Sequence, residues 1–366
     1  MSSFWTHPLV LRGLNAIAMG RAFLKYRNPR RVASGKHQAE FYERMWRDAA
    51  LELGGTSKRL TADVSEMTFD GFRTRVNENV TSIDDPVTLA VLHDKPLTYR
   101  LLAAQGLCVP RHATFSTKNM GPAVEFLKSF GFDCVVKPAC GTGGGRGVTT
   151  GIQRLSHLAK AAAFASVYCD ELLIEEQVDG DNYRLLYLDG QLIDCFVRRL
   201  PTVLGNGRSS VRGLVELANQ ERLRNKTDIS QVLLTFDLDM YRTLAKQGLS
   251  LSAVPAKGRT VTLKTVVNEN SGVDNVTATA SLCQSVINDC AKAVRILGAR
   301  FAGVDVITRD PRVPLAESGG VILEVNGTPN LYYHYKKKDG PFPVAVHLLK
   351  RIISSARTRE LTESSL

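Results

Sequence analysis

The sequence contains seven cysteines but no Cys-x-x-Cys pair, and it has no low-complexity tract and no internal repeat. An odd number of cysteines without a framework excludes a disulfide-stapled scaffold and favours a reducing compartment, so we expect a cytoplasmic protein. Cys283 and Cys290 lie two helical turns apart, which is typical of a core helix face. Cys140 has no evident base nearby and is expected to be a small structural residue rather than a nucleophile.

Acidic residues are missing from the first 39 positions, which contain seven Lys or Arg. The formal charge of +11 therefore leaves +4 for the rest of the chain, and the basic character belongs to an N-terminal arm. Within the arm, residues 8–24 are too short and too charged for a membrane span and lack the charged start of a secretory signal. We expect the arm to pack on a neighbouring domain or subunit. An organelle transit peptide and a membrane-surface helix are the open alternatives.

A glycine-rich loop follows a short apolar segment that ends in Lys137 and Pro138. Glycine permits positive φ and close backbone approach, so successive N–H groups can surround a phosphate. No lysine follows the glycines as a Walker loop requires, and Arg146 and Val148 stand where a dinucleotide fingerprint needs glycine. Arg146 offers a cation to phosphate oxygens instead. We interpret the loop as a phosphate cradle, the alternative being an ordinary hairpin turn. Its residues are Gly141, Thr142, Gly143, Gly144, Gly145, Arg146 and Gly147.

Two apolar segments near the C-terminus each carry an acidic residue, Asp305 within 301–307 and Glu324 within 321–325. Both segments read as buried strands, and residues two apart in a strand share a face, so Glu324 and Asn326 point the same way. A buried carboxylate is costly unless it is paired or metal-bound. Asp305, Glu324 and Asn326 offer only oxygen ligands, which Mg²⁺ prefers. The alternative is that these acids cap turns at strand ends.

The chain resembles the ATP-grasp carboxylate–amine ligases over about residues 94–334, roughly two-thirds of its length. Within that superfamily it is most similar to the ATP-grasp module of cyanophycin synthetases. The segments 198–215 and 247–258 and the strand around Asp305 carry the similarity. The resemblance implies an α/β (α+β) ATP-grasp fold that holds the nucleotide between two α+β domains.

The resemblance also implies roles for single residues. Lys95 and Lys137 match lysines that bind the nucleotide. Arg199 matches an arginine that faces the phosphates or an acyl phosphate, and Arg184 is a second candidate for that role or for holding a substrate carboxylate. Surface ion pairing is the alternative for both arginines. The adenine hinge of the family corresponds to Glu175, Glu176 and Val178, and the ribose contact corresponds to Asn182. The Mg²⁺ ligands of the family correspond to Asp305, Glu324 and Asn326.

Departures from the family pattern leave the substrate open. The glycine loop is one residue longer than in cyanophycin synthetases, and Asn182 replaces the acid that relatives place at the ribose. The family's substrate loop is shortened to residues 270–274 and includes Ser271 and Gly272. Tyr332 and His334, which follow the second acidic strand, are expected to line the acceptor pocket, with core packing as the alternative. The chain ends about thirty residues after His334, so we expect no second ligase module.

The expected function is an ATP-dependent ligase. A carboxylate attacks the γ-phosphorus of ATP to form an acyl phosphate, and an amine then forms an amide, with ADP and phosphate as products. The expected cofactors are ATP and Mg²⁺, the latter as two ions. The expected partners are amino acids or small peptides and a second copy of the chain. Nucleic acid is not expected, because aromatic and basic residues do not interleave. The alternatives are an ATP-grasp kinase or carboxylase and a non-catalytic nucleotide-binding protein.

The predicted organisation has five parts: an arm over 1–36, an N-terminal domain over 37–92, a nucleotide-binding lid over 93–180, a catalytic domain over 181–355 and a tail over 356–366. Apolar periodicity predicts helices over 37–53, 97–105 and 282–297, and strands around Val136 and Ile174. Residues 60–91 read as short strands alternating with polar turns. A strand, a polar hinge and a second strand are predicted over 171–187. The segment 205–265 matches an insertion of the family, and its pattern predicts no particular fold.

Overall fold

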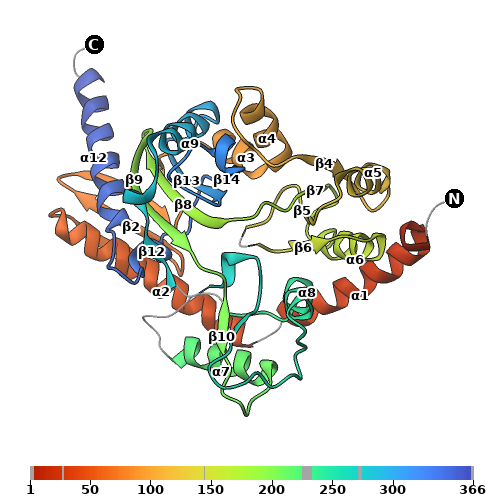
Figure 1. The fold of residues 1–366 in the computed structure, drawn as a ribbon. Coiled ribbons are helices and arrows are strands. Elements are labelled where there is room, and N and C mark those ends of the chain that lie inside the picture. The colour runs from red at the N-terminus through yellow and green to blue at the C-terminus, as the bar shows by residue number, and fades with distance from the viewer. Residues whose placement is uncertain (1–3, 27–28, 144, 225–232, 271–273, 364–366) are drawn as a thin grey trace.

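The computed structural model describes the whole chain except for residues 1–3, 27–28, 144, 225–232, 271–273 and 364–366. Its described strands form four sheets, and neighbouring strands are antiparallel in every sheet (Figure 1). Antiparallel sheets with helices on their faces define an α+β fold, which is the form that the sequence predicted.

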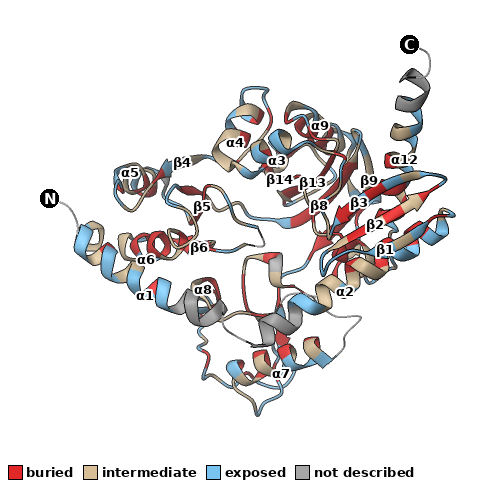
Figure 2. Ribbon diagram, turned by 180° about the vertical axis from the view of Figure 1, so that it is seen from behind, coloured by how far each residue is buried: buried red, intermediate tan, exposed pale blue. Residues whose placement is uncertain are grey.

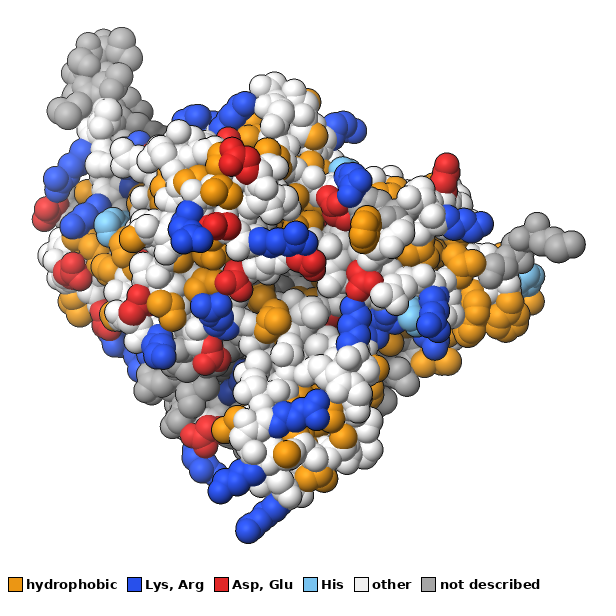
Figure 3. All heavy atoms as spheres, in the orientation of Figure 1, with side chains coloured by type: hydrophobic (Ala, Val, Ile, Leu, Met, Phe, Trp, Pro, Cys, Tyr) orange, Lys and Arg blue, Asp and Glu red, His pale blue; other side chains and the backbone are white. Residues whose placement is uncertain are grey.

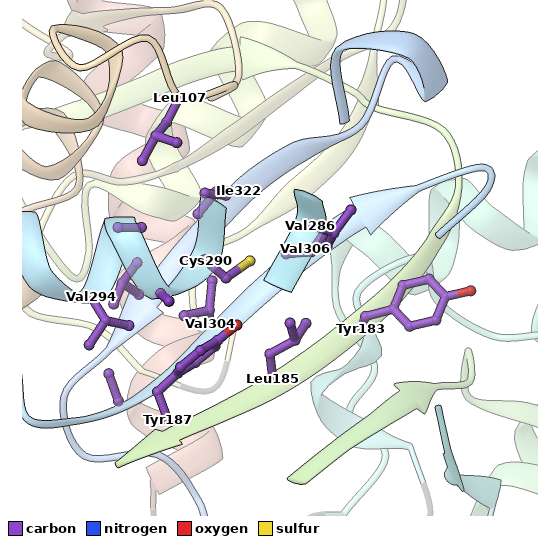
Figure 4. Close-up of a cluster of buried hydrophobic side chains, with 14 of the residues drawn as sticks. Leu107, Tyr183, Leu185, Tyr187, Val286, Cys290, Val294, Val304, Val306 and Ile322 are labelled. Carbon is purple, nitrogen blue, oxygen red and sulfur yellow. The ribbon is translucent and has the colours of Figure 1, made fainter. Parts of the chain in front are cut away.

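The largest sheet has five strands in the order β12, β9, β8, β13 and β14. One of its faces is apolar and is covered by helix α9 (Gln284–Ile296), from which Cys290 and Val294 reach the strands (Figure 4). Because side chains alternate along a strand, Val304 joins this core while its neighbour Asp305 lies on the opposite face. The strands are β8 (Asp181–Leu188), β9 (Gln191–Arg198), β12 (Val276–Thr277), β13 (Phe301–Thr308) and β14 (Val321–Asn326).

A second sheet has four strands in the order β4, β7, β5 and β6. Helices α5 (Gly121–Phe130) and α6 (Leu155–Ala165) pack on it, and the alanines of α6 allow that helix to approach the strands closely. The loop between β5 and β6 is the glycine-rich segment. The strands are β4 (His112–Phe115), β5 (Cys134–Pro138), β6 (Thr149–Ile152) and β7 (Leu172–Glu176).

The N-terminal arm begins with a short 3₁₀ turn, η1 (Phe4–Thr6), and helix α1 (Pro8–Tyr26). Leu11 is buried in the core around α6, and Asn15 Nδ2 donates a hydrogen bond of 2.7 Å to Ser166 Oγ. This is the packing on a neighbouring domain that we expected for the arm. Leu9 remains exposed, and Figure 3 shows hydrophobic side chains gathered at this end of the molecule. Within the described ranges, no helix is both long enough and apolar enough to cross a membrane.

The third sheet, β1 (Thr56–Arg59), β2 (Val64–Phe69) and β3 (Phe72–Asn77), packs with helices α2 (Pro29–Glu52) and α12 (Val344–Glu363). Trp46 is fully buried at its centre and donates a hydrogen bond of 2.7 Å to the carbonyl of Glu78. Figure 2 shows the buried residues of this sheet beside those of the five-stranded sheet. The helix predicted over 37–53 is present, but it begins earlier, at Pro29.

The prediction of strands up to residue 91 is wrong at its C-terminal end. Residues 86–93 form helix α3 (Pro86–His93). Asp85 caps this helix by accepting hydrogen bonds from the amides of Val87 and Thr88, and Pro86 occupies the first turn, where no N–H is needed. Helix α4 (Lys95–Ala103) follows directly, and both helices pack on the core of the five-stranded sheet.

The predicted insertion forms a small unit with its own apolar core. The unit contacts the edge strand β6 through two hydrogen bonds. Asp239 accepts one of 2.6 Å from Thr150 Oγ1, and Arg242 donates one of 2.9 Å to the Thr150 carbonyl. Its elements are β10 (Thr202–Leu204), α7 (Val211–Arg224), α8 (Leu238–Lys246) and β11 (Thr260–Thr262). Other short helices are the 3₁₀ helices η2 (Val267–Glu269) and η4 (Thr279–Ser281) and the α-helices α10 (Leu315–Ser318) and α11 (Tyr332–Tyr335).

Candidate nucleotide and metal site

The polar face of the five-stranded sheet brings the predicted acids together. Asp305 on β13 lies directly opposite Glu324 on β14 and opposite Arg184 on β8, and residues that lie opposite each other share a face. Asn326 lies opposite Gly303, one step along the same face. The register shifts just after Asp305, so the strict pairing ends there.

Asp305 is held by two buried arginines. Its two carboxylate oxygens accept hydrogen bonds of 2.6 and 2.8 Å from Nε and Nη2 of Arg184, and Arg198 Nη1 lies 3.7 Å from Oδ1. Burial lowers the pKa of Arg184, but the charge of Asp305 more than offsets it, so the pKa lies above its usual value. Surface ion pairing, the alternative that we left open for Arg184, does not occur here, because the pair is buried.

Glu324 faces a lysine rather than an arginine. Lys95 Nζ lies 3.3 Å from Glu324 Oε1, and the carboxylate is more exposed than that of Asp305. Burial opposes ionisation of Glu324, but Lys95, Lys137 and Arg184 outweigh it, so the pKa of Glu324 is lowered. Glu324 is therefore an anion at neutral pH.

Local structure fixes Lys95 at the mouth of the glycine loop. Asp94 caps α4 by accepting a hydrogen bond from the amide of Leu97, which sets the start of the helix. The amide of Lys95 donates to the carbonyl of Ala139, two residues before Gly141. The first residue of α4 is thus tied to the end of β5.

Lys137 on β5 and Glu175 on β7 form another buried ion pair, in the four-stranded sheet. Lys137 Nζ lies 2.7 Å from Glu175 Oε1 and donates to Tyr99 Oη at 3.0 Å. Tyr99 Oη also lies 3.0 Å from Glu175 Oε2 and 2.7 Å from the carbonyl of Leu323. Burial and the charge of Glu175 raise the pKa of Tyr99, so its hydroxyl stays protonated. This network joins the four-stranded sheet to β14.

The carboxylates of the predicted hinge are occupied by protein groups. The side chain of Glu175 is committed to Lys137, and the carboxylate of Glu176 accepts from the amide and guanidinium of Arg111. An adenine contact at this hinge would therefore use backbone groups, as the sequence suggested for Glu176 and Val178. Asn182, the second residue of strand β8, is buried, and its Oδ1 has no hydrogen-bond partner within the described structure.

The glycine loop has the backbone conformations that its composition predicts. Gly141, Gly145 and Gly147 have φ values of 70°, 69° and 77°, which L side chains adopt only with strain. A Cβ on Gly147 would lie 2.7 Å from Pro138 Cγ, so this end of the loop is also closely packed. Gly143 and Arg146 are exposed and Thr142 is partly buried. Gly144 lies outside the described residues.

Adjacent arginines at the end of β9 have different environments. Arg199, the predicted phosphate ligand, is exposed and pairs with Asp181 at 3.3 Å. Surface ion pairing, the alternative left open for it, is what the structure has. Arg198 is instead buried next to Asp305, with its guanidinium 5.7 Å from the centre of the Tyr333 ring. The sequence reasoning missed Arg198, although β8 and β9 pair through Asn182 and Arg198 on the polar face.

The predicted acceptor residues divide between packing and polar contacts. Tyr332 is buried in a small aromatic cluster with Phe196, which favours core packing, the alternative given for it. His334 is completely buried, and its Nδ1 lies 2.7 Å from Asp194 Oδ2. Lys337 Nζ pairs with the other oxygen of Asp194 at 2.7 Å. The other two predicted substrate residues, Ser271 and Gly272, lie outside the described residues.

Two of these contacts were not predicted, and only the first had a signal in the sequence. Tyr99 follows Lys95 by four residues on α4, and residues four apart share a helix face. The pairing of Asp194 with His334 and Lys337 joins β9 to the chain after β14, and no local pattern indicates it.

The oxygen donors fit a hard divalent cation only in part. Glu324 and Asn326 offer oxygens of the kind that Mg²⁺ prefers, and the amide nitrogen of Asn326 is turned toward Asp305 and Gly303 at 3.4 Å. Both oxygens of Asp305, by contrast, are engaged by Arg184. Across the described ranges, no group of three or more His, Cys, Asp or Glu side chains is arranged to hold a metal ion. Glu324 is therefore the strongest ligand candidate of the three.

Comparison with known proteins finds relatives of this chain by sequence. No family model matches the chain. It is 32% identical over 250 residues to a cyanophycin synthetase of Trichormus variabilis, covering 68% of this chain and 27% of that protein. It is 29% identical over 272 residues to a glutathione biosynthesis bifunctional protein GshAB of Streptococcus mutans, covering 72% of this chain and 36% of that protein. The chain thus spans about a third or less of these relatives' own lengths.

A solved structure has the same fold. The bifunctional glutathione synthetase of Pasteurella multocida superposes with a TM-score of 0.52 at 23% sequence identity, over 83% of this chain and 43% of that one.

Proposed function

Because this chain belongs to the ATP-grasp superfamily, in which it is similar to cyanophycin synthetase, we propose that it is an ATP-dependent carboxylate–amine ligase. The proposed reaction activates a carboxylate as an acyl phosphate and transfers it to an amine, releasing ADP and phosphate. The proposed substrates are amino acids or small peptides. The relatives support this class, since they are a cyanophycin synthetase and a protein of glutathione biosynthesis.

The observation that carries the proposal is the meeting of Lys95 and Glu324 at 3.3 Å. Lys95 comes from the start of α4, beside the glycine loop, and Glu324 comes from the polar face of the five-stranded sheet. A cation suited to a phosphate and an anion suited to a magnesium ion thus lie at the junction of the two sheets. Transfer of a phosphoryl group needs these two kinds of charge side by side.

The proposed work of the chain is positioning and charge stabilisation. Lys95 is proposed to bind phosphate oxygens, and the N–H groups of the glycine loop are proposed to enclose them. Lys137 is held by Glu175 and Tyr99, so its proposed part is to bind at the floor of the nucleotide site. Arg198 and Arg184 are proposed to stabilise the negative charge of the acyl phosphate, sharing Asp305 as their counter-ion.

Ligases of this superfamily use ATP and Mg²⁺. We propose that Glu324 and Asn326 hold two ions together with ATP, and that Asp305 contributes only if Arg184 releases one of its oxygens. When bound, such ions neutralise charge on the phosphates. The closed glycine loop would exclude water from the acyl phosphate.

The test is a product analysis with the purified protein. The chain is incubated with ATP and Mg²⁺ against a panel of amino acids and dipeptides, and phosphate release is followed while mass spectrometry detects any amide. We expect ADP, phosphate and an amide in equal amounts for at least one pair of substrates. Reactions without ATP are the control. Stoichiometric AMP, or a phosphorylated product without an amide, would contradict the proposal.

A further inference from the structure

Two thiols meet at the root of the glycine loop. Cys140 Sγ and Cys169 Sγ lie 3.0 Å apart, and both side chains are partly exposed. All seven cysteines belong to the described residues and are free, and no other two of them are hydrogen-bonded to each other. The contact therefore distinguishes this pair from the five remaining cysteines.

The backbone around the two thiols is already joined. Cys140 directly precedes Gly141, and Cys169 lies in the connection between α6 and β7. The amide of Ala139 donates a hydrogen bond of 3.0 Å to the carbonyl of Glu171, so each partner lies within two residues of a cysteine. A covalent link between the thiols would thus require little movement of the chain.

The same connection also braces the far end of the loop. A Cβ on Gly147 would lie 3.0 Å from Tyr168 Cδ2, which means that the Tyr168 ring packs directly on the Gly147 backbone. Residues 168 and 169 therefore touch both ends of the glycine loop, one through an aromatic ring and the other through a thiol. Fixing Cys169 to Cys140 would restrain the loop at its root.

We propose that Cys140 and Cys169 form a dithiol site that a peroxide oxidises to a disulfide, and that this disulfide restrains the phosphate-binding loop and lowers turnover. The effect on turnover rests on the proposed function, but the disulfide itself does not. The site joins a redox signal to the loop that would close over ATP.

The chemistry balances with one peroxide for each disulfide. One thiol loses its proton, and the thiolate attacks hydrogen peroxide and becomes a sulfenic acid; the displaced hydroxide takes up that proton as water. The second thiol also loses its proton, and its thiolate attacks the sulfenic sulfur, forming the sulfur–sulfur bond and displacing a hydroxide that takes up the second proton as water. Two thiols are oxidised by two electrons in total, and the peroxide is reduced to two waters.

The surroundings of Cys140 set the pace of this reaction. The hydrogen bond with Cys169, burial, and the charges of Asp94 and Glu171 raise the pKa of Cys140 to about 11. Because the thiolate is the reactive form, oxidation at neutral pH is slow and accelerates as the pH rises. Such a site responds to sustained rather than brief exposure to peroxide.

The experiment treats the full-length protein with hydrogen peroxide and maps its peptides by mass spectrometry without reduction. We expect a peptide pair linked through Cys140 and Cys169, absent in Cys169→Ser and present in Cys283→Ser, a matched control at another partly exposed cysteine. ATP turnover should fall roughly tenfold or more, because misplaced phosphate contacts are costly. Dithiothreitol should restore it, and Cys169→Ser should resist the loss.

Three results would overturn the inference. One is oxidation of Cys140 or Cys169 to sulfinic acid without a link between them. Another is a link to a different cysteine or to a second molecule. The third is a complete Cys140–Cys169 link that leaves both ATP affinity and turnover unchanged. If no amide product is found at all, the proposed function fails while the disulfide and its effect on ATP affinity remain measurable.

Discussion

Two of the buried clusters of charged side chains in the described part of the chain differ in their balance of charge. In the insertion, Lys264 is 3% exposed and lies 2.6 Å from Asp237 and 2.7 Å from Glu269. It also donates to Thr235 Oγ1 at 2.9 Å, so all three of its hydrogens have acceptors. One lysine is thus enclosed by two acids.

The second cluster consists of the polar face of the five-stranded sheet and the adjoining Lys137–Glu175 pair. In this cluster the described cations outnumber the acids. The four cations are Lys95, Lys137, Arg184 and Arg198, and the three acids are Glu175, Asp305 and Glu324. This cluster has a place for further negative charge, which a polyphosphate supplies, whereas the insertion cluster has none. Burial of charge alone does not mark a phosphate site; an excess of cations over acids does.

The largest effect should follow removal of the acid that two arginines share. Asp305→Ala leaves Arg184 and Arg198 buried without their counter-ion, and breaking such a pair costs about 3–5 kcal/mol of stability. The free energy of unfolding in urea measures it. Asp181→Ala, which removes the exposed partner of Arg199, is the control and should cost less than about 1 kcal/mol. Equal losses in the two variants would show that the buried pair has no special weight.

A loss of stability without a loss of ATP binding should follow Lys264→Met. The substitution removes the cation that pairs with Asp237 and Glu269 and leaves both carboxylates without a counter-ion. We therefore expect the free energy of unfolding to fall by about 3 kcal/mol. ATP affinity, measured by calorimetry below the new unfolding temperature, should stay within a few-fold of wild type. A large fall in affinity would mean that the two clusters act as one.

Sequence reasoning predicted the site cluster better than it predicted the fold of the insertion. The alternation of β-strands placed Glu324 and Asn326 on one face, and the apolar run before Lys137 placed that lysine at a strand end. These are local patterns, and the structure has them. The pairing of Lys137 with Glu175 and Tyr99 depends on how two sheets meet, which no single segment specifies.

Strand register explains one of the remaining differences, and local propensity and packing explain the other two. Arg198 and Arg199 are adjacent, and a one-residue shift turns a strand side chain to the opposite face, so the sequence could not decide which one is buried. Helix α3 was not predicted: its residues Val87, Thr88 and Val91 are β-prone, whereas the Asp85–Pro86 cap that begins it is a helix signal. The insertion core joins two short strands to two helices, and neither the strands nor the helices alone indicate that packing.

A smaller effect concerns pH. Burial lowers the pKa of His334 below 6.5 despite its contact with Asp194, so the folded protein keeps the ring neutral. The burial of a neutral His334 ring costs no stability above pH 6.5, where the ring is also neutral in the unfolded chain. Stability is lost as the pH falls below that value, because the unfolded chain then binds the extra proton. In unfolding curves between pH 5 and 8, His334→Asn should show a shallower loss below pH 6.5 than wild type, and an identical slope would contradict the assignment.

The smallest effect should follow Arg199→Ala. Its partner Asp181 is exposed and pairs at 3.3 Å, so stability should change by less than about 1 kcal/mol and turnover by no more than a few-fold. Arg198→Ala is the matched variant, and steady-state kinetics should show a much larger fall in kcat. If the order were reversed, the acyl phosphate would be held at the surface end of β9 rather than on the polar face.

The most direct test of the polar face as the phosphoryl-transfer site is the rate of ADP formation by Glu324→Gln at ordinary Mg²⁺. Glutamine keeps the shape of Glu324 and an oxygen for Lys95, but it removes the negative charge that a phosphate-bound ion needs. We predict a fall in kcat of roughly a hundredfold or more in a variant that remains folded at the assay temperature. Wild-type turnover in this folded variant would contradict the central claim.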